Sequence, residues 1–440
     1  MPAEARTRSR NGPRRTVPSV FALAAVIIAA LTAGCGDSSP APSASASPTG
    51  AAPTVAARPT PAPTTSPSLA AVLPSGSPPP KAPSAWSRVP KQPSVSGVQF
   101  QLVVWTGTRF VATGTALDAG GVFLDSPDGL TWHRQATNIP SPWATALAAG
   151  PLGVVAVAST DDGATAWASG DGLTWTHRKD AFPAPKRIAG TSGPRSIQVT
   201  GIVATEDGWL AVGREDPDCQ FDCGGAPIRA VVWKSPDGLA WTLASDQKSL
   251  RGGGMNAVAR FNGGFVAVGL RASRAAVWTS PDGAAWSLVA DAPLFHSQHG
   301  VDFGISMGGV AADHGVVVAI GMDGPGSEVA SVRAWWSADG TTWHKATGQK
   351  FKSGQVFSVT STPLGFLATG PSGDTSCRGG IWQSADGRAW SCVAADRKFE
   401  GFGPYAAAAS SSLIVAVGLD GSGPDSDQGL PGAVWWKPLP

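Results

Sequence analysis

From about residue 85 onward, short apolar runs alternate with polar turns rich in Gly, Asp and Ser. Within the runs Val, Ile, Phe and Trp alternate with small or polar residues, which is the two-residue period of a β-strand. No segment in this part keeps the 3.6-residue period of an amphipathic helix. The pattern therefore predicts an all-β fold.

One motif of the form SxDGxxW recurs six times, and we call it the SxDG motif. Its Asp residues are Asp128, Asp171, Asp237, Asp282, Asp339 and Asp386, and its Trp residues are Trp132, Trp175, Trp241, Trp286, Trp343 and Trp390. Before each motif lie three apolar runs, of which the second and third are, for example, 264–269 and 276–280, and a fourth strand carries the Trp. Four short strands in a repeat of about 45 residues are typical of a β-propeller blade.

The two chain ends together predict one further blade. Residues 412–418 and 433–437 repeat the second and third strands of a blade, but no final strand follows them. Residues 84–89 have the pattern of a final strand, but the other three strands of a blade do not precede them. Trp86 precedes Trp132 by one normal repeat. We therefore expect a seven-bladed β-propeller of four-stranded antiparallel blades, with the last blade closed by strand 84–89. Six or eight blades are the alternatives.

Each residue type of the SxDG motif suits a turn between the third and fourth strands. Pro or another small residue fits the second position of a type I turn, and Gly fits the left-handed conformation after it. Ser and Asp side chains bond to neighbouring backbone N–H groups. We expect a four-residue hairpin turn with a glycine bulge, and a Trp packed between blades.

This pattern resembles the Asp box, or BNR repeat, of sialidases, sortilin-type receptors, xyloglucanases and photosystem-assembly-like propellers, with one residue fewer between Ser and Trp. The resemblance covers nearly all of residues 85–440. It implies a propeller in which the six Asp-box turns lie away from the substrate-binding face. A sialidase would also need an arginine trio, a Tyr nucleophile paired with Glu, and an acid/base Asp. The single Tyr, Tyr405, lies near Glu400, but the family's early Arg-Ile-Pro motif is missing.

The loops that vary between repeats join the second to the third strand and one blade to the next. We call the side on which they lie the variable-loop face. Variable loops on a rigid scaffold commonly carry function. The candidate binding residues there are Arg195, Arg214, Asp216, Arg229, His296, His299, Tyr405 and Asp425. We expect a non-catalytic monomer that binds an envelope or extracellular protein, peptide or glycan; the alternative is an extracellular sialidase-like or other glycoside hydrolase.

No cofactor or metal is expected. The two histidines of HSQH, His296 and His299, read as a chance pair rather than a metal site. The spaced aspartates of residues 419–429 leave Ca²⁺ as the alternative, although they lack the EF-hand order and its terminal Glu. Phosphate-binding loops, nucleophile elbows and HExxH are also missing from the sequence.

Residues 1–34 are predicted to be a lipoprotein signal peptide. Five arginines precede an apolar run, roughly residues 20–33, that is too short to be a convincing membrane span. The run ends at LTAGC, which resembles the lipobox of bacterial lipoproteins, although Thr32 replaces the more usual Leu. The resemblance implies cleavage before Cys35 and acylation of that Cys, which would anchor the protein to the outer face of the cytoplasmic membrane. A plain or twin-arginine signal is the alternative.

Residues 35–84 are mostly Pro, Ser, Ala and Thr, and this composition predicts a disordered tether that carries the lipidated Cys35. Residues 85–440 would then form the propeller domain. The whole chain carries a formal charge of +2. Without five Arg and Glu4 of the signal this becomes about −2, and no basic cluster for nucleic acid remains.

Four cysteines remain besides Cys35. In an exported chain an even number of cysteines indicates disulfides. Cys219 and Cys223 lie close together, and Cys377 and Cys392 flank the last SxDG motif. We expect two disulfides; buried free thiols are the alternative.

Overall fold

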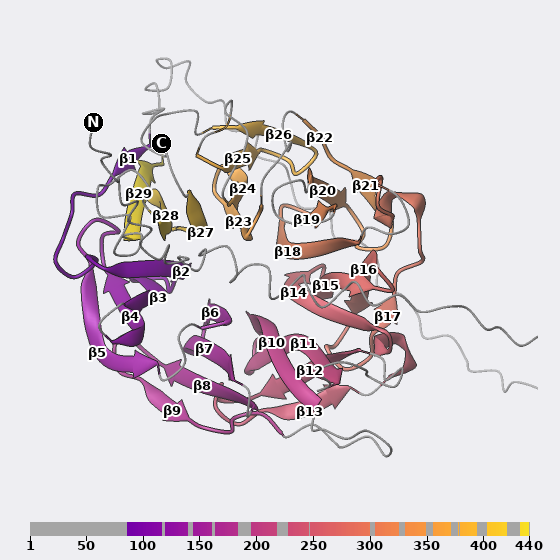
Figure 1. Ribbon diagram of the computed structural model, residues 1–440, viewed down its shortest axis with the longest axis horizontal. Coiled ribbons are helices and arrows are strands. Elements are labelled where there is room, and N and C mark those ends of the chain that lie inside the picture. The colour runs from indigo at the N-terminus through magenta and orange to yellow at the C-terminus, as the bar shows by residue number, and fades with distance from the viewer. Residues whose placement is uncertain are drawn as a thin grey trace, which may run out of the picture.

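The computed structural model describes residues 86–116, 119–139, 144–160, 163–183, 195–217, 228–245, 247–299, 304–324, 331–348, 355–370, 377, 379–393, 403–419 and 432–439. Within them the chain forms seven antiparallel sheets arranged as the blades of a ring (Figure 1). The predicted all-β class and the predicted seven blades are confirmed. The predicted signal peptide, Cys35 and the whole predicted tether lie outside the described residues.

Each blade has an inner strand beside the central opening and further strands towards the rim (Figure 1). From the inside outwards, blades 1 to 3 consist of β2 (Val98–Trp105), β3 (Phe110–Ala116), β4 (Gly120–Ser126) and β5 (His133–Ile139); β6 (Ala146–Gly150), β7 (Gly153–Thr160), β8 (Gly163–Ser169) and β9 (Thr176–Arg178); and β10 (Arg195–Ala204), β11 (Trp209–Pro217), β12 (Arg229–Ser235) and β13 (Thr242–Ser245).

Blades 4 to 7 follow the same order. They consist of β14 (Gly253–Phe261), β15 (Gly264–Arg271), β16 (Arg274–Ser280) and β17 (Ser287–Leu288); β18 (Ile305–Asp313), β19 (Val316–Asp323), β20 (Ser331–Ser337) and β21 (His344–Lys345); β23 (Ser358–Thr362), β24 (Gly365–Thr369), β25 (Ile381–Ser384) and β26 (Ala389–Cys392); and β27 (Pro404–Ala409), β28 (Leu413–Leu419), β29 (Gly432–Pro438) and β1 (Ser87–Arg88). A short strand, β22 (Thr347–Gly348), adds to the rim of blade 6, parallel to β26.

The two chain ends close the ring as predicted. Strand β1 pairs antiparallel with β29, with Ser87 opposite Trp436 and Arg88 opposite Trp435. Trp86 is 4% exposed and packs into the apolar cluster shared by blades 6 and 7. Closure joins the first and last segments of the chain in one sheet, which removes the edges of an open repeat.

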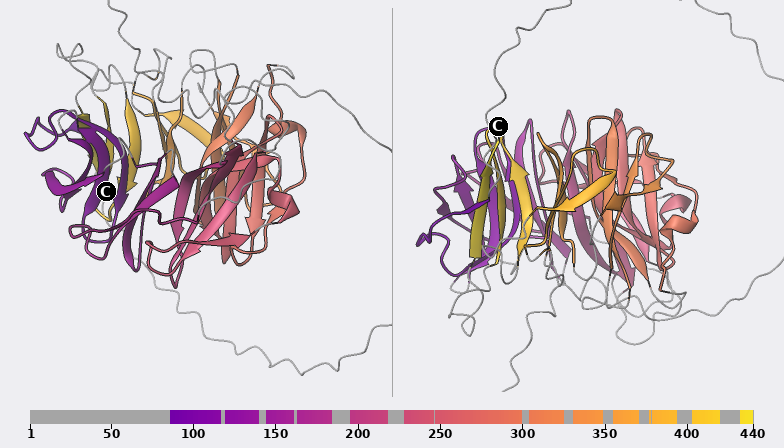
Figure 2. Two further views of the ribbon diagram at one scale, coloured as in Figure 1. Left: turned by 60° about the horizontal axis from the view of Figure 1, so that its bottom comes forward. Right: turned by 90° about the horizontal axis from the view of Figure 1, so that it is seen from above.

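The core lies between neighbouring blades. The strands run between the two faces of the ring (Figure 2), and their side chains alternate towards the blades on either side. The third strand of blades 2 to 7 carries one fully buried Trp in each blade: Trp167, Trp233, Trp278, Trp335, Trp382 and Trp435. At the closing seam, residues of blades 1 and 7 such as Phe100, Val415 and Val434 share one apolar cluster.

Helical structure within the described residues is limited to two 3-10 turns, η2 (Lys248–Leu250) and η3 (Pro293–Phe295). Neither of these turns has the length and hydropathy needed to cross a membrane.

The SxDG motif forms a longer loop than predicted. In blade 1 the last pair between β4 and β5 is Asp125 with His133, and β4 ends at Ser126, so residues 127–132 form the loop. The expected four-residue hairpin turn is therefore wrong, because the Asp side chain organises the loop in place of strand pairing. Asp128 Oδ1 accepts the N–H groups of Leu130 and Thr131 at 2.8 and 2.7 Å and the Ser126 hydroxyl at 3.0 Å.

The Gly of each SxDG loop lies against the preceding blade. Gly129 has φ +72°, a left-handed conformation that favours glycine. A Cβ at this position would lie 2.7 Å from Cγ2 of Val415 in blade 7. The other five motif glycines face the preceding blade in the same way, against Val111, Val155, Leu210, Val266 and Val318. The SxDG loops therefore connect each blade to the one before it.

Inner strands carry a recurrent bulge near the variable-loop face. The register shifts by one residue at Gln101, Thr200, Asn256, Gly308 and Tyr405. Thr200 Oγ1 donates to the Met255 carbonyl at 2.7 Å, and Asn256 Nδ2 donates to the Met307 carbonyl at 2.8 Å. A bulge re-aims its side chain, and here it links the inner strand to that of the next blade.

The SxDG aspartates should make the stability of the fold depend on pH in the acid range. Hydrogen bonds from the Thr174 and Leu173 N–H groups lower the pKa of Asp171 from 3.8 to about 2. The ionised carboxylate therefore stabilises the fold above pH 3.8, and this contribution is lost as the pH falls towards about 2. At Asp128 and Asp237 burial acts in the opposite direction, but hydrogen bonds outweigh it and the pKa still lies below its usual value.

We expect Asp171→Asn to lose less stability on acidification than the wild type. Asn keeps an acceptor oxygen for both N–H groups but does not titrate. Urea unfolding at neutral pH and at about pH 3 measures the difference. An equal drop in both proteins would show that the turn does not favour the ionised carboxylate.

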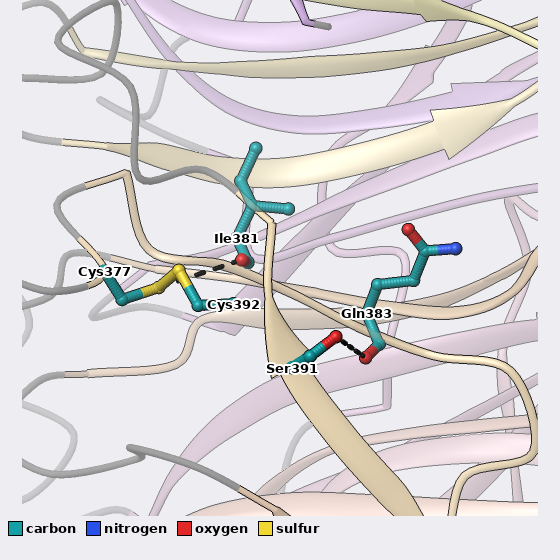
Figure 3. Close-up of a disulfide and its surroundings, with 5 residues drawn as sticks. All are labelled: Cys377, Ile381, Gln383, Ser391 and Cys392. Carbon is teal, nitrogen blue, oxygen red and sulfur yellow. Dashed lines mark hydrogen bonds between the residues drawn. A yellow bond between two sulfur atoms is a disulfide. The ribbon is translucent and has the colours of Figure 1, made fainter. Parts of the chain in front are cut away.

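One of the two predicted disulfides lies among the described residues. Cys377 and Cys392 are bonded, with their Cα atoms 5.7 Å apart (Figure 3). Cys377 Sγ also lies 3.9 Å from the Ile381 carbonyl oxygen. The bond ties the segment before β25 to the outer strand β26 of the same blade. Cys219 and Cys223 lie outside the described residues, so their pairing stays a prediction.

We expect the double variant Cys377→Ala/Cys392→Ala to be about 3 kcal/mol less stable, because the bond closes a short loop in the unfolded chain. Thermal melts with and without dithiothreitol measure the effect. Dithiothreitol should lower the melting temperature of the wild type, and any response left in the variant would report the predicted Cys219–Cys223 bond. A variant as stable as the wild type would contradict the expectation.

Candidate functional site

Strand register separates the variable-loop face from the SxDG loops. In blade 1, Val98 pairs with Ala116 at one end of β2, and Trp105 pairs with Phe110 at the other. The join between β3 and β4 follows Ala116, whereas Ser126, where the SxDG loop begins, pairs with Phe110. The candidate binding loops and the SxDG loops therefore leave each sheet at opposite ends.

Two of the candidate arginines form ion pairs at the ends of β11 and β12. Arg214 Nε lies 2.9 Å from Asp216 Oδ2, and Arg229 Nη2 donates to both carboxylate oxygens of Glu215 at 3.0 and 2.9 Å. Glu215 and Arg229 are directly opposite each other across the strands. Arg214 is only 3% exposed, and its side chain packs over Gly254 of the next blade. These pairs fix the strand ends from which the loop 218–227 leaves.

His296 belongs to an exposed charged group at the connection between blades 4 and 5. The Asp291 carboxylate accepts a hydrogen bond from Arg274 Nη1 at 2.6 Å, and it lies 2.9 Å from His296 Nε2. Burial alone would raise the pKa of Asp291, but the hydrogen bond and electrostatic attraction from His296, together with those from Arg274, lower it. About half of the Arg274 and Asp291 side chains is exposed. This group is available to a partner at the surface.

A buried ion pair lies directly beneath the HSQH segment. Asp323 is fully buried and pairs with Arg333 Nη2. It also accepts the Ser297 hydroxyl at 2.5 Å and the Gln298 N–H at 3.1 Å. The middle residues of HSQH thus anchor the connection to blade 5. The two flanking histidines make different contacts. The His296 side chain binds Asp291, whereas the backbone N–H of His299 donates to Ser297 Oγ at 3.1 Å.

Tyr405 lies at the bulge of inner strand β27. Its ring packs 4.6 Å from the ring of Phe357 on the neighbouring blade, and burial raises the pKa of its phenol.

Glu400, the expected partner of Tyr405 in a sialidase, lies outside the described residues. Asp425 does too, and Arg195 is described only as the first backbone position of β10. Within the described ranges, no group of three or more His, Cys, Asp or Glu side chains is arranged to hold a metal ion.

Glu215, Asp323 and Arg333 were not among the residues predicted from the sequence. Each comes from the end of a second strand or the start of a third strand, next to a loop of variable length. Charged residues that interrupt an apolar strand at this position are the signal that would have found them.

Among the described residues, the SxDG side of the ring has at least two cavities. One, of about 230 Å³, lies between blades 2 and 3 beside Leu152, Trp209 and Asp237. The other, of about 370 Å³, lies at the central opening and is lined by Trp105, Asp313, Ser361, Thr362, Pro363, Ala409, Ser410 and Ser411. We call the second the mouth cavity. Neither cavity could be predicted from the sequence, because their walls come from separate blades.

Comparisons with solved structures find propellers. A streptogramin B lyase matches 81% of this chain and 98% of its own at 8% identity, with a TM-score of 0.50. The Trypanosoma rangeli sialidase bound to a difluoro-KDN ligand matches 64% of this chain at 14% identity, with a TM-score of 0.41. The present chain spans only 55% of that sialidase. These likenesses concern the fold alone. The sequence matches no protein-family model, and no curated protein matches it.

Proposed function

We propose that this protein is a non-catalytic, lipid-anchored cell-surface β-propeller that binds a protein, peptide or glycan partner through its variable-loop face. We also propose that the six SxDG loops are Asp boxes, which hold the blades together. The observation that carries the binding proposal is the set of ion pairs at the loop-bearing strand ends. These ion pairs hold the strand ends in place, so the loops and exposed charges leave the blades from fixed positions. Fixed positions reduce the conformational entropy that is lost on binding.

The carboxyl groups favour binding over glycan hydrolysis. A glycosidase needs a general acid whose pKa is raised so that it is protonated near neutral pH. Seven aspartates among the described residues have a pKa below the usual value, so these seven are poorly suited to act as that acid. A sialidase-type Tyr nucleophile must lose its proton, whereas burial favours the neutral phenol of Tyr405.

The binding proposal is tested in cells that produce the full chain. One variant replaces residues 218–227 with a short Gly-Asn linker and keeps Arg214, Glu215 and Arg229. A matched control, Leu173→Ser, changes an exposed residue of an SxDG loop. Crosslinking followed by mass spectrometry should recover a partner with the wild type and the control but not with the loop variant.

Hydrolysis assays cover the alternative function. Incubation with sialyllactose and a panel of nitrophenyl glycosides should give no turnover above background. Turnover that Tyr405→Phe abolishes would overturn the non-catalytic proposal. Partner capture that is unaffected by the loop variant, or lost in Leu173→Ser, would overturn the assignment to the variable-loop face.

The lipid anchor has a separate test. In the wild type we expect the chain in the membrane fraction, with acyl groups on Cys35 found by mass spectrometry of the N-terminal peptide. Cys35→Ser should move the protein to the soluble or secreted fraction, since a lipid chain supplies the membrane affinity. A Cys35→Ser protein that stays in the membrane would contradict the anchor.

A further inference from the structure

The mouth cavity spans the SxDG end of the central opening. Trp105 ends β2 in blade 1, and Asp313 ends β18 in blade 5. Turns of blades 6 and 7, which lie between them in the ring, complete the wall. Its volume of about 370 Å³ is in the range of small-molecule sites, which is roughly 300–1,000 Å³. It opens at the end of the ring opposite to the variable-loop face.

The aromatic wall of the cavity is held in place. The Trp105 ring packs against Phe110 at 4.6 Å, and Trp105 remains partly exposed. The turn that follows is closed by Thr106, whose hydroxyl donates to the Arg109 carbonyl at 3.0 Å and accepts the Arg109 N–H at 3.1 Å. Arg109 in turn pairs with Asp125 at 3.1 Å. Trp105 is thus a pre-positioned apolar platform.

The opposite walls are polar. Ser410 and Thr362 use their hydroxyls to close their own turns, which makes these walls rigid. Asp313 Oδ1 accepts the His314 N–H at 2.8 Å and lies 3.0 Å from Nδ1 of the exposed His314 ring, so that within the part of the chain that the structure describes only Oδ2 is left for a ligand. Of the residues that line the cavity, only Asp313 is charged. The free carboxylate oxygen is therefore the strongest acceptor available to a ligand.

We propose that the mouth cavity binds a neutral sugar unit, at a site separate from the variable-loop face. The C–H face of a sugar ring would pack on Trp105, and its hydroxyls would donate to Asp313. The sole charge of the lining is negative, so the cavity disfavours acidic sugars such as sialic acid. The site does not depend on the proposed function of the variable loops.

Saturation-transfer NMR on the full chain in a zwitterionic, sugar-free detergent tests the proposal. The probes are cellobiose, N,N′-diacetylchitobiose and galactose as neutral sugars, sialyllactose as an acidic sugar, and lysine as an amine. We expect transfer to the ring protons of at least one neutral sugar. Trp105→Ala should weaken its binding about tenfold and Trp105→Phe less, because Phe keeps an aromatic face. Asp313→Asn should weaken it several-fold.

Matched measurements separate this site from the other face and from unfolding. Far-UV circular dichroism should be the same for all variants, and the 218–227 replacement should bind the sugar as the wild type does. The proposal is overturned if no neutral sugar receives saturation, or if sialyllactose or lysine binds more tightly than the neutral sugars. It is also overturned if Trp105→Ala and Asp313→Asn bind as the wild type does, or if the 218–227 replacement abolishes binding.

Discussion

Trp132→Ala should cost about 3–5 kcal/mol of the free energy of unfolding, as large buried aromatic truncations do. Trp132 is 2% exposed and lies in the apolar cluster shared by blades 1 and 7. Its indole donates to the Gly129 carbonyl at 3.1 Å, and its backbone N–H donates to Gln92 Oε1 at 3.0 Å. The truncation would therefore open a cavity at the seam that closes the ring. Urea unfolding followed by circular dichroism measures the loss.

Trp175→Ala is the matched control within the same motif. Trp175 is half-buried and does not bond its own loop; its indole donates to Gln135 Oε1 at 2.6 Å, and its ring stacks 3.9 Å from that of Phe123. Less area is lost there, so we expect about 1–2 kcal/mol. Similar losses of unfolding free energy in the two variants would show that the position of Trp132 at the closing seam does not make its truncation more costly.

The blades could be predicted from the sequence because their signals are local and repeat. Alternating apolar residues give the strands, and Asp and Gly at fixed spacing give the loops. The closing strand was found because Trp86 precedes Trp132 by about the length of the shorter repeats. The turn type was missed, because Asp128 bonds to the two N–H groups that follow it, which keeps the strands apart as far as Trp132.

The ion pairs at the loop-bearing strand ends depend on strand register, which cannot be read from sequence spacing alone. Glu215 and Arg229 are separated by a loop, and only the pairing of β11 with β12 sets them opposite each other. Arg214 and Arg229 were predicted to bind a partner, yet both are engaged in ion pairs within the blade. The mouth cavity depends on the arrangement of four blades, so no single repeat indicates it.

Arg333→Met should be as costly as the loss of Trp132. Asp323 is fully buried, and Arg333 is its only cationic partner among the described residues. Removing one member of a buried ion pair strands the other charge and typically costs about 3–5 kcal/mol. The Ser297 and Gln298 hydrogen bonds to Asp323 remain, but they do not neutralise its charge. Urea unfolding gives the loss, and hydrogen exchange should quicken at residues 296–299.

Arg260→Met provides the same substitution in an exposed pair. Arg260 lies 3.0 Å from Glu206, whose side chain is 87% exposed, and such surface pairs contribute about 0–1 kcal/mol. The double variant Arg333→Met/Asp323→Asn should recover part of the loss, because it removes the stranded charge while Asn still accepts the Ser297 hydroxyl. If Arg333→Met costs no more than Arg260→Met, the ion pair does not hold the connection between blades 4 and 5. The HSQH segment would then lack the rigid support that its proposed role in binding requires.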